Sequence, residues 1–147
     1  MLEAIKTAIF KTYKQEDLKG LFFSLFDANK NLLVSNGVIT TDKPLGQLID
    51  ILYNAIVTKH PETQSIVVDI VTETTLQNDV ATLLGLLPTE NGLVILDKDD
   101  KKSGVILPGT AGITDMKTAI TKTKEKFGLS GEVEMYTFKT EKISISK

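Results

Sequence analysis

Apolar residues recur with two different periods along this sequence, and the places where the period changes limit the folds open to the chain. Residues 45–58 follow the helical period of about 3.6, with Pro44 suited to the first helical position and an apolar face made of Leu45, Leu48, Ile49, Leu52 and Ile56. By contrast, "SIVVDIVTET" at residues 65–74 is rich in β-branched side chains, which favour strands. The sequence therefore mixes helices and strands within one short chain.

The same periods place the remaining elements. They predict helices over residues 2–14, 78–87 and 115–127, and strands over 21–27, 32–35, 66–73, 93–97, 103–107, 132–140 and 142–146. Tight turns are expected at residues 28–31 and at Asn36-Gly37, and Asn78 is expected to cap the short helix. Because the elements do not follow strict βαβ alternation, we expect the α+β class. The expected fold is a single domain over residues 1–147, with a largely antiparallel sheet packed against about three helices.

Composition narrows the possible functions. A length of 147 residues suits one domain with one sizeable core. All 17 basic residues are Lys, the net charge is −2 and there is no Trp, so we expect no nucleic-acid partner. The chain has no Cys, which excludes disulfides, a thiol nucleophile and a thiolate metal site. It has no apolar run of about 20 residues and starts with an amphipathic segment, so we expect no membrane partner and a cytoplasmic location.

A strand, a glycine-spaced loop and a helix follow one another in residues 101–130, an arrangement that cradles phosphate in many proteins. A Walker-type loop needs Lys and then Ser or Thr directly after its second Gly, but Gly109 is followed by Thr110 and Ala111. Asp115 also places a carboxylate near the amides that a phosphate would need. We therefore expect this loop to be scaffold and not a nucleotide site.

The scaffold interpretation gives each loop residue a structural role. Pro108 and Gly109 end the strand, Thr114 is the predicted N-cap of the next helix, and Gly128 is predicted to close that helix. No cofactor is expected from this pattern.

Three other residue groups are candidates for chemistry. His60, the single histidine, stands in the polar stretch "TKHPET", which favours an exposed loop residue over a base or metal ligand. The tip at residues 97–102, "DKDDKK", lacks the calcium-loop pattern, so we expect no tight metal site. Ser35 has no identifiable base nearby in the sequence and is interpreted as a turn residue. We identify no catalytic residue, and whether the chain is an enzyme stays open at this point.

The stretch "GVILPGTAGITDMKTAITKTKEKFGLSGEVEMYTFKTEKI" resembles the carboxy-terminal half of the AMMECR-type domain, also called AmmeMemoRadiSam system protein A. That family has a hairpin with Gly-x-Leu-Leu-Pro-Gln, a helix ending in a Lys-Ala-Gly-Leu-like turn, and a Tyr-x-Phe strand. The corresponding stretches here are 104–109, 126–129 and 136–138. Upstream, "LFFSLFDANKNLLVSNGVITTDKPLGQLI" resembles the family's strand, glycine turn and Pro-Leu helix, and the order of elements matches from about residue 20 to 143.

The sequence departs from the family at its most distinctive motif. The family carries Leu-Arg-Gly-Cys-Ile-Gly, whereas residues 32–37 here read "LLVSNG", which keeps only the first Leu and the last Gly. The family's Asp-Pro-Arg-Phe stretch is echoed only by His60-Pro61, and its Gln after Leu-Pro is replaced by Gly109. The resemblance implies the family's fold, together with a partner or accessory role beside Memo-like proteins and radical S-adenosylmethionine enzymes.

Two functions therefore compete. The first is a non-catalytic binding or accessory module of AMMECR type, which requires an exposed apolar patch or an unpaired strand edge. The second is a small-molecule-binding protein or enzyme, with a site between the Ser35–Gly37 turn and the Pro108–Thr114 loop. The candidate binding residues are Ser35, Asn36, Gly37, His60, Pro108, Gly109 and Thr110.

Overall fold

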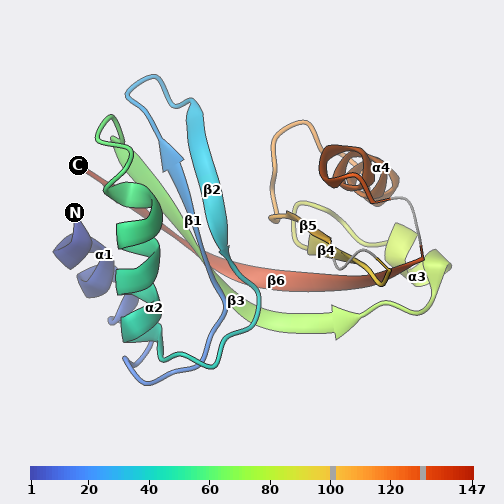
Figure 1. Ribbon diagram of the computed structural model, residues 1–147, viewed down its shortest axis with the longest axis horizontal. Helices are drawn as coiled ribbons and strands as arrows, with labels where there is room; N and C mark the ends of the chain where they lie inside the picture. Colours follow the sequence, from blue (N-terminus) through green and yellow to red (C-terminus); the bar gives the residue numbers. More distant parts are fainter. Residues whose placement is uncertain (100–101, 130–131) are drawn as a thin grey trace. The chain divides into compact units, whose positions relative to one another are not determined.

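Helices and strands of the computed structural model cover most of the chain, and residues 1–99, 102–129 and 132–147 are described (Figure 1). The helices are α1 (Leu2–Ile9), α2 (Leu45–Leu52), α3 (Val80–Leu84) and α4 (Met116–Phe127), and a π-helical turn, η1 (Tyr53–Val57), directly follows α2. The strands are β1 (Leu21–Phe26), β2 (Leu32–Val38), β3 (Ser65–Leu76), β4 (Gly92–Asp97), β5 (Ser103–Ile106) and β6 (Val133–Ser146).

The strands found among the described residues are joined in the hydrogen-bonding order β2-β1-β3-β6-β4-β5. β1 pairs antiparallel with β2 and β3, and β4 pairs antiparallel with β5 and β6. The α+β class and the largely antiparallel sheet are therefore confirmed. Where two strands were predicted in residues 132–146, the structure has the single strand β6, which continues through the expected break at Glu141.

The described residues divide into two compact units. The first unit comprises Met1–Val71 and Glu141–Lys147, and the second comprises Thr72–Thr140, so β3 and β6 contribute residues to both. Each unit has its own cluster of buried apolar side chains, whereas one core was expected. Strand length gives a physical reason: the 12 residues of β3 span roughly 40 Å, while the eight residues of α2 span only about 12 Å. One helical layer cannot cover so long a strand.

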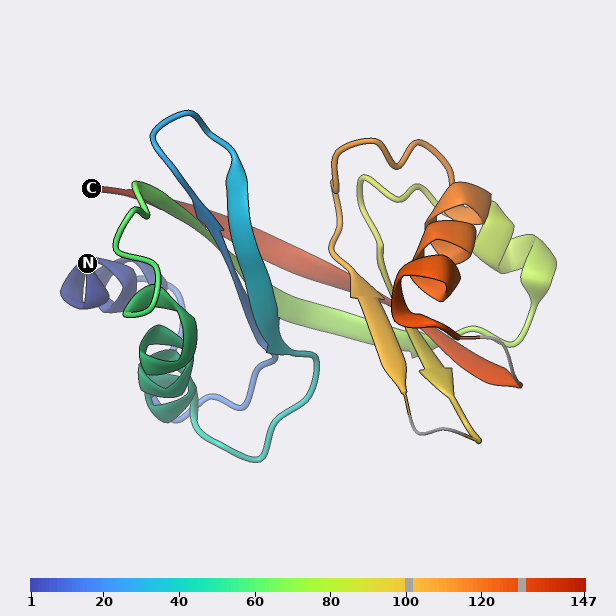
Figure 2. The same cartoon turned by 45° about the horizontal axis from the view of Figure 1, so that its top comes forward.

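The core of the first unit forms between α1, α2 and one face of β1 and β3 (Figures 1 and 2). Alternate residues of the paired strands point to this face and are fully buried, namely Leu21, Phe23 and Leu25 on β1 and Ile66, Val68 and Ile70 on β3. The helices contribute Ile5, Ile9, Leu45 and Ile49, which are also fully buried. This alternation leaves the intervening strand residues on the other face of the sheet.

In the second unit, α4 packs beside β4 and β5. Leu93 and Ile95 of β4 and Met116 and Ala119 of α4 belong to the buried cluster. Gly104 on β5 makes this approach possible, because a Cβ at its position would come within 2.5 Å of the Phe127 ring and 2.7 Å of the Thr123 methyl group.

Three helices are shorter than their apolar period suggests, and the one predicted over residues 78–87 is only α3, which ends at Leu84 before the cap at Gly85. α1 ends at Ile9, although the predicted helix ran to residue 14, because the chain leaves the helix at Phe10 while the Tyr13 amide still donates to the Ile9 carbonyl. The apolar spacing therefore outlasts the helix. After Leu52 the predicted helix over 45–58 continues as η1, where the Thr58 amide donates to the Tyr53 carbonyl five residues back.

Two predicted helix caps are wrong by one residue. Asp79, and not Asn78, caps α3 by accepting a hydrogen bond from the Ala81 amide. Asp115, and not Thr114, caps α4 by accepting from the Thr118 amide at 2.7 Å. In both cases the neighbouring aspartate is the cap, because a carboxylate is the stronger acceptor at the positive end of a helix. Gly128 closes α4 with φ of 66°, as predicted.

Candidate functional site

The candidate residues predicted from the sequence belong to different units. Ser35, Asn36, Gly37 and His60 lie in the first unit, and Pro108, Gly109 and Thr110 lie in the second. In the first unit, Ser35 lies on the face of the sheet that points away from α1 and α2.

Ser35 lies on β2, directly opposite Ser24 of β1. The two hydroxyl oxygens are 3.0 Å apart and share a hydrogen bond, and Ser24 is buried. Each hydroxyl thus has a partner that is not a base. A nucleophilic serine needs a base that removes its proton, and another serine cannot do this at neutral pH. The pair can orient a bound polar group but offers no activated nucleophile.

An ion pair lies on the neighbouring strands of the same unit. Nζ of Lys142 on β6 is 2.6 Å from Oδ1 of Asp69 on β3. The Asp69 side chain is fully buried, whereas the Lys142 side chain is 43% exposed. Burying a carboxylate is costly unless a cation and hydrogen bonds compensate it, so Lys142 serves to hold this charge inside the sheet. The sequence pattern missed this pair, because the two residues are 73 positions apart.

The Asn36-Gly37 dipeptide is not a turn, which corrects the prediction. Both residues lie inside β2, where Asn36 is opposite Phe23 and Gly37 is opposite Phe22. A Cβ at position 37 would collide with the Leu21 carbonyl and come within 2.6 Å of the Phe22 Cα. Glycine is therefore required by close backbone approach and not by a turn.

The turn between β1 and β2 is formed by residues 27–31, where one was predicted. Oδ1 of Asp27 accepts hydrogen bonds from the amides of Asn29 and Asn31, and Lys30 adopts a positive φ of 63°. An aspartate that ties down two following amides is a self-contained turn signal. Because this turn already brings β2 back alongside β1, the chain continues through Asn36 as a strand.

His60 follows η1 and is partly buried, not fully exposed as expected. Its Nδ1 lies 2.8 Å from the carbonyl oxygen of Ile56, and its own carbonyl accepts from the Thr63 hydroxyl at 2.7 Å. These contacts close the end of the helix. The ring nitrogen that faces the backbone is not available as a base or as a metal ligand.

Pro108, Gly109 and Thr110 form a loop built from backbone contacts. Pro108 is buried, and the Gly109 amide donates to the Pro88 carbonyl at 2.9 Å. The Thr110 hydroxyl donates to the Leu107 carbonyl at 2.7 Å. Gly109 has a φ of 76°, in the left-handed region that favours glycine. The Gly109 amide and the Thr110 hydroxyl are thus both engaged by backbone carbonyls.

The amino terminus of α4 is occupied by its own cap. The backbone hydrogen bond from Thr118, followed by a side-chain hydrogen bond from the same residue, lowers the pKa of the Asp115 carboxyl. A carboxylate held there repels a second anion. This local charge supports a scaffold role for the loop.

Metal-ligating side chains are scattered over residues 1–99, 102–129 and 132–147. No cluster of three or more His, Asp or Glu side chains lies there with metal-binding geometry. In the tip at residues 97–102, Asp97 is buried and its Oδ1 accepts from the Asp99 amide, while Asp100 and Lys101 lie outside the described residues. Across residues 1–99, 102–129 and 132–147, no helix has both the length and the apolar character that crossing a bilayer requires.

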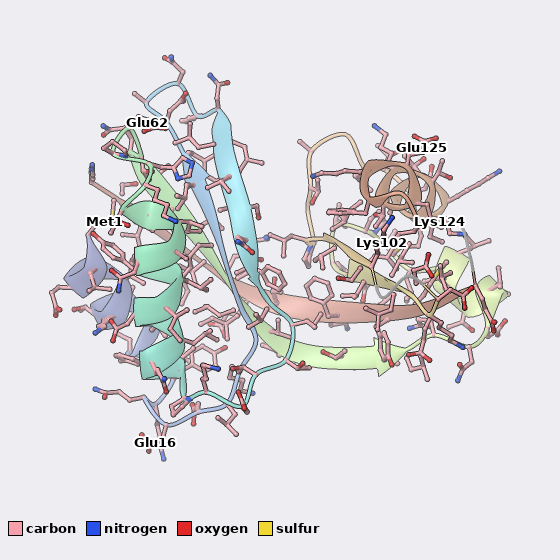
Figure 3. The ribbon with its side chains drawn as sticks, viewed as in Figure 1. Met1, Glu16, Glu62, Lys102, Lys124 and Glu125 are labelled. Atoms are coloured by element: carbon pink, nitrogen blue, oxygen red, sulfur yellow. The ribbon has the colours of Figure 1, made fainter. Side chains whose placement is uncertain are left out.

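An open groove of about 530 Å³ lies beside α1 and α2 in the first unit. It is crossed by an ion pair of 2.8 Å between Lys6 Nζ and Asp50 Oδ1, and that hydrogen bond raises the pKa of Lys6. Figure 3 shows Glu16, another lining residue, in the loop between α1 and β1. The charges of Lys6 and Asp50 therefore neutralise each other, and Gln15, Glu16 and Gln47 are the other polar residues that line the groove.

The second unit has a stripe of exposed apolar side chains, which we call the α3 stripe. It consists of Leu76, Val80, Leu84 and Leu87, whose exposed fractions are 42%, 68%, 46% and 57%. The spacing of four residues puts Val80 and Leu84 on one side of α3, while Leu76 belongs to β3 and Leu87 follows the end of the helix. Leu83, one residue before Leu84, is buried. The sequence did not reveal the stripe, because the adjacent Leu83 and Leu84 do not show by themselves which of the two is buried.

Comparison with known proteins adds information on the fold. No protein-family model matches the chain, and no curated protein is significantly similar to it in sequence. Among solved structures, the chain is similar to the crystal structure of uncharacterized protein PH0010 from Pyrococcus horikoshii, with a TM-score of 0.73. The two sequences are 17% identical, and the similarity covers 97% of this chain and 86% of that chain. At this identity the likeness shows a shared fold and nothing about activity.

Proposed function

We propose that the chain is a non-catalytic binding or accessory module of the AMMECR type. The observation that carries the proposal is the α3 stripe, because four large apolar side chains are exposed within 12 residues. Leaving such a patch in water is unfavourable, and exposed patches of this kind mark surfaces that bind other proteins. The occupant proposed here is an apolar segment of a protein partner.

The chemistry of the polar candidates supports the same proposal. The hydroxyl of Ser35 is bonded to Ser24, the ring of His60 faces a backbone carbonyl, and the hydroxyl of Thr110 faces another. A catalytic site would need a nucleophile next to a base, or an acid and base that converge on a pocket. These side chains stabilise turns and strands instead.

The resemblance to the AMMECR-type family suggests the partner class. By that resemblance, the partner is a Memo-like protein or a radical S-adenosylmethionine enzyme. The charge, the composition and the amphipathic start of the sequence separately favour a module that works in the cytoplasm without nucleic acid or membrane. The α3 stripe gives such a partner an apolar surface on which to dock.

Calorimetric titration of the full chain tests the proposal. The probes are the Memo-like protein and the radical S-adenosylmethionine enzyme of the same organism. We expect saturable binding to one of them, weakened at least tenfold by the double substitution Val80→Ser with Leu84→Ser. Leu18→Ser is the matched control, because Leu18 is 61% exposed in the first unit and outside the stripe. Absence of binding to both probes, or equal loss in the control, would overturn the proposal.

A further inference from the structure

The outer edge of β2 in the first unit has the properties of a docking site for an extended polypeptide. β2 ends the hydrogen-bonding order of the strands in the described residues. Its seven residues, "LLVSNGV", contain neither a charged residue nor a proline, which natural proteins use to protect such edges. Leu32 and Val38, at its two ends, are 57% and 37% exposed.

The ladder shows which backbone groups of β2 point outward. The Val71 amide donates to the Gly20 carbonyl at 2.9 Å, so the groups of Gly20 and of every second residue after it face β3. The intervening residues of β1 face β2, and the bond from the Asp27 amide to the Asn31 carbonyl agrees with this alternation. Their partners on β2 are Val34, Asn36 and Val38. The backbone groups of Ser35 and Gly37 therefore point away from β1.

One side chain guards this edge. The outward amide of Gly37 donates to Oδ1 of Asn36 at 2.8 Å, so the Asn36 carboxamide occupies the position that a new strand would take. Gly37 has no side chain, and position 37 cannot accept one because of the Leu21 carbonyl and Phe22. The hydroxyl of Ser35 is directed to Ser24 on the face of the sheet. Protection therefore depends on the rotation of a single exposed amide.

We propose that the outer edge of β2 binds an extended segment of a partner protein by strand addition, and that Asn36 is the guard that yields on binding. Only another extended backbone can match alternating donors and acceptors at Ser35 and Gly37. Because the edge is uncharged, apolar side chains beside Leu32 and Val38 supply the selectivity. A second copy of this chain is the less favoured occupant, because two Asn36 side chains would have to leave their amides at once.

The site is independent of the α3 stripe, since the two surfaces belong to different units and share no residue. The loss of one therefore leaves the other intact. Failure of the edge proposal would not affect the test of the accessory function, and the reverse also holds.

Nuclear magnetic resonance titration of the full chain tests the edge directly. The probe is a synthetic peptide with the sequence acetyl-Lys-Val-Thr-Val-Thr-Lys-amide, and the readout is the backbone amide shifts. We expect saturable shifts confined to β2 and its pairing partner β1. Asn36→Ala removes the guard and should tighten binding at least tenfold. Ser35→Pro removes an outward amide without breaking the ladder, and should abolish binding that Ser35→Ala retains.

A matched probe keeps the test decisive if Ser35→Pro does not fold. The same peptide, N-methylated at its central residues, cannot form the ladder and should not shift β2. Binding of the methylated peptide, equal affinity of Asn36→Ala and the unaltered chain, or shifts outside β1 and β2 would overturn the proposal. Sedimentation velocity without peptide covers the alternative occupant. A dimer formed by Asn36→Ala alone would show that the edge binds a second copy, and would also overturn it.

Discussion

The hydroxyl of Tyr13 connects two segments of the first unit that are 128 residues apart, by donating a hydrogen bond to the Glu141 carboxylate. Burial of the ring, followed by this hydrogen bond, raises the pKa of Tyr13 to about 12 from 10.0. Both causes favour the neutral phenol in the folded chain. The stability of the first unit therefore decreases in the alkaline range, where Tyr13 loses its proton.

The hydroxyl of Tyr13 stabilises the fold at neutral pH and ceases to do so at high pH. Because the pKa is higher in the folded state, the contribution of Tyr13 is fully present below pH 10 and is lost as the pH rises toward 12. We expect the melting temperature of the unaltered chain to fall more steeply across this window than that of Tyr13→Phe. Lysine titration affects both proteins equally, so the difference isolates Tyr13. Parallel curves in thermal unfolding followed by circular dichroism would contradict the assignment.

At the residue scale, the sequence indicated which residues matter better than it indicated their structural roles. Ser35, Asn36 and Gly37 were identified as candidates, but the turn assigned to them is wrong because the close approach of Phe22 demands a glycine in the strand. The ion pair between Asp69 and Lys142 forms only because β3 and β6 lie side by side. No local sequence pattern predicts which distant strands become neighbours. Hydrogen bonds within a turn, such as those of Asp27, are local and were predictable.

Among the elements, α4 shows how a cap is chosen between two neighbouring residues. Asp115 accepts from the Thr118 amide, whereas Thr114 makes no cap bond. We expect Asp115→Ala to lower the melting temperature by a few degrees at neutral pH, while Thr114→Ala leaves it nearly unchanged. The matched variant Asp115→Asn keeps an acceptor oxygen and should retain most of the stability.

The cap also has a pH dependence, opposite in sign to that of Tyr13. The pKa of Asp115 is lowered from 3.8, so its contribution is present above that value and is lost as the pH falls through the folded-state pKa. Acid titration of the melting temperature for the unaltered chain and for Asp115→Ala measures this. If Thr114→Ala were the more damaging change, the assignment of the cap would be wrong.

Element types were predictable because apolar period and turn chemistry act over a few residues. The helices near 45 and 116 and the strands near 21, 66, 93 and 103 occur where the period indicated them. Element ends were less predictable. α1 stops at Ile9 although Tyr13 continues the apolar spacing, because Tyr13 packs from a turn.

On the scale of the whole molecule, the α+β class followed from the sequence, but the division of the buried side chains into two clusters did not. Which apolar residues share a cluster depends on long-range pairing, as between β4 and β6, which lie some 40 positions apart in the chain. The α3 stripe was hidden for a similar reason. Whether Val80 or Leu83 is buried depends on α4, which is not adjacent in the sequence.

Because each unit has its own buried apolar cluster, a substitution in one cluster should destabilise mainly that unit. Ile95 of β4 is fully buried in the second unit, and Ile95→Ala should cost about 2–5 kcal/mol. We expect faster hydrogen exchange at the amides of β4 and β5 than at those of β1 and β2. Ile49→Ala is the matched control in the first unit and should give the reverse pattern. Equal loss of protection in both units would contradict two clusters.

The split of the first unit between residues 1–71 and 141–147 has a consequence for synthesis on the ribosome. Ile145 fills the first cluster, Lys142 neutralises Asp69 and Glu141 receives the Tyr13 hydroxyl, yet these three residues are translated after residues 1–140. The early part of the nascent chain thus emerges without the Lys142 ammonium that pairs with Asp69 and without the Ile145 side chain that fills the first cluster. Its sheet is completed only when β6 leaves the exit tunnel, so the first part of the chain to be made is among the last to become stable.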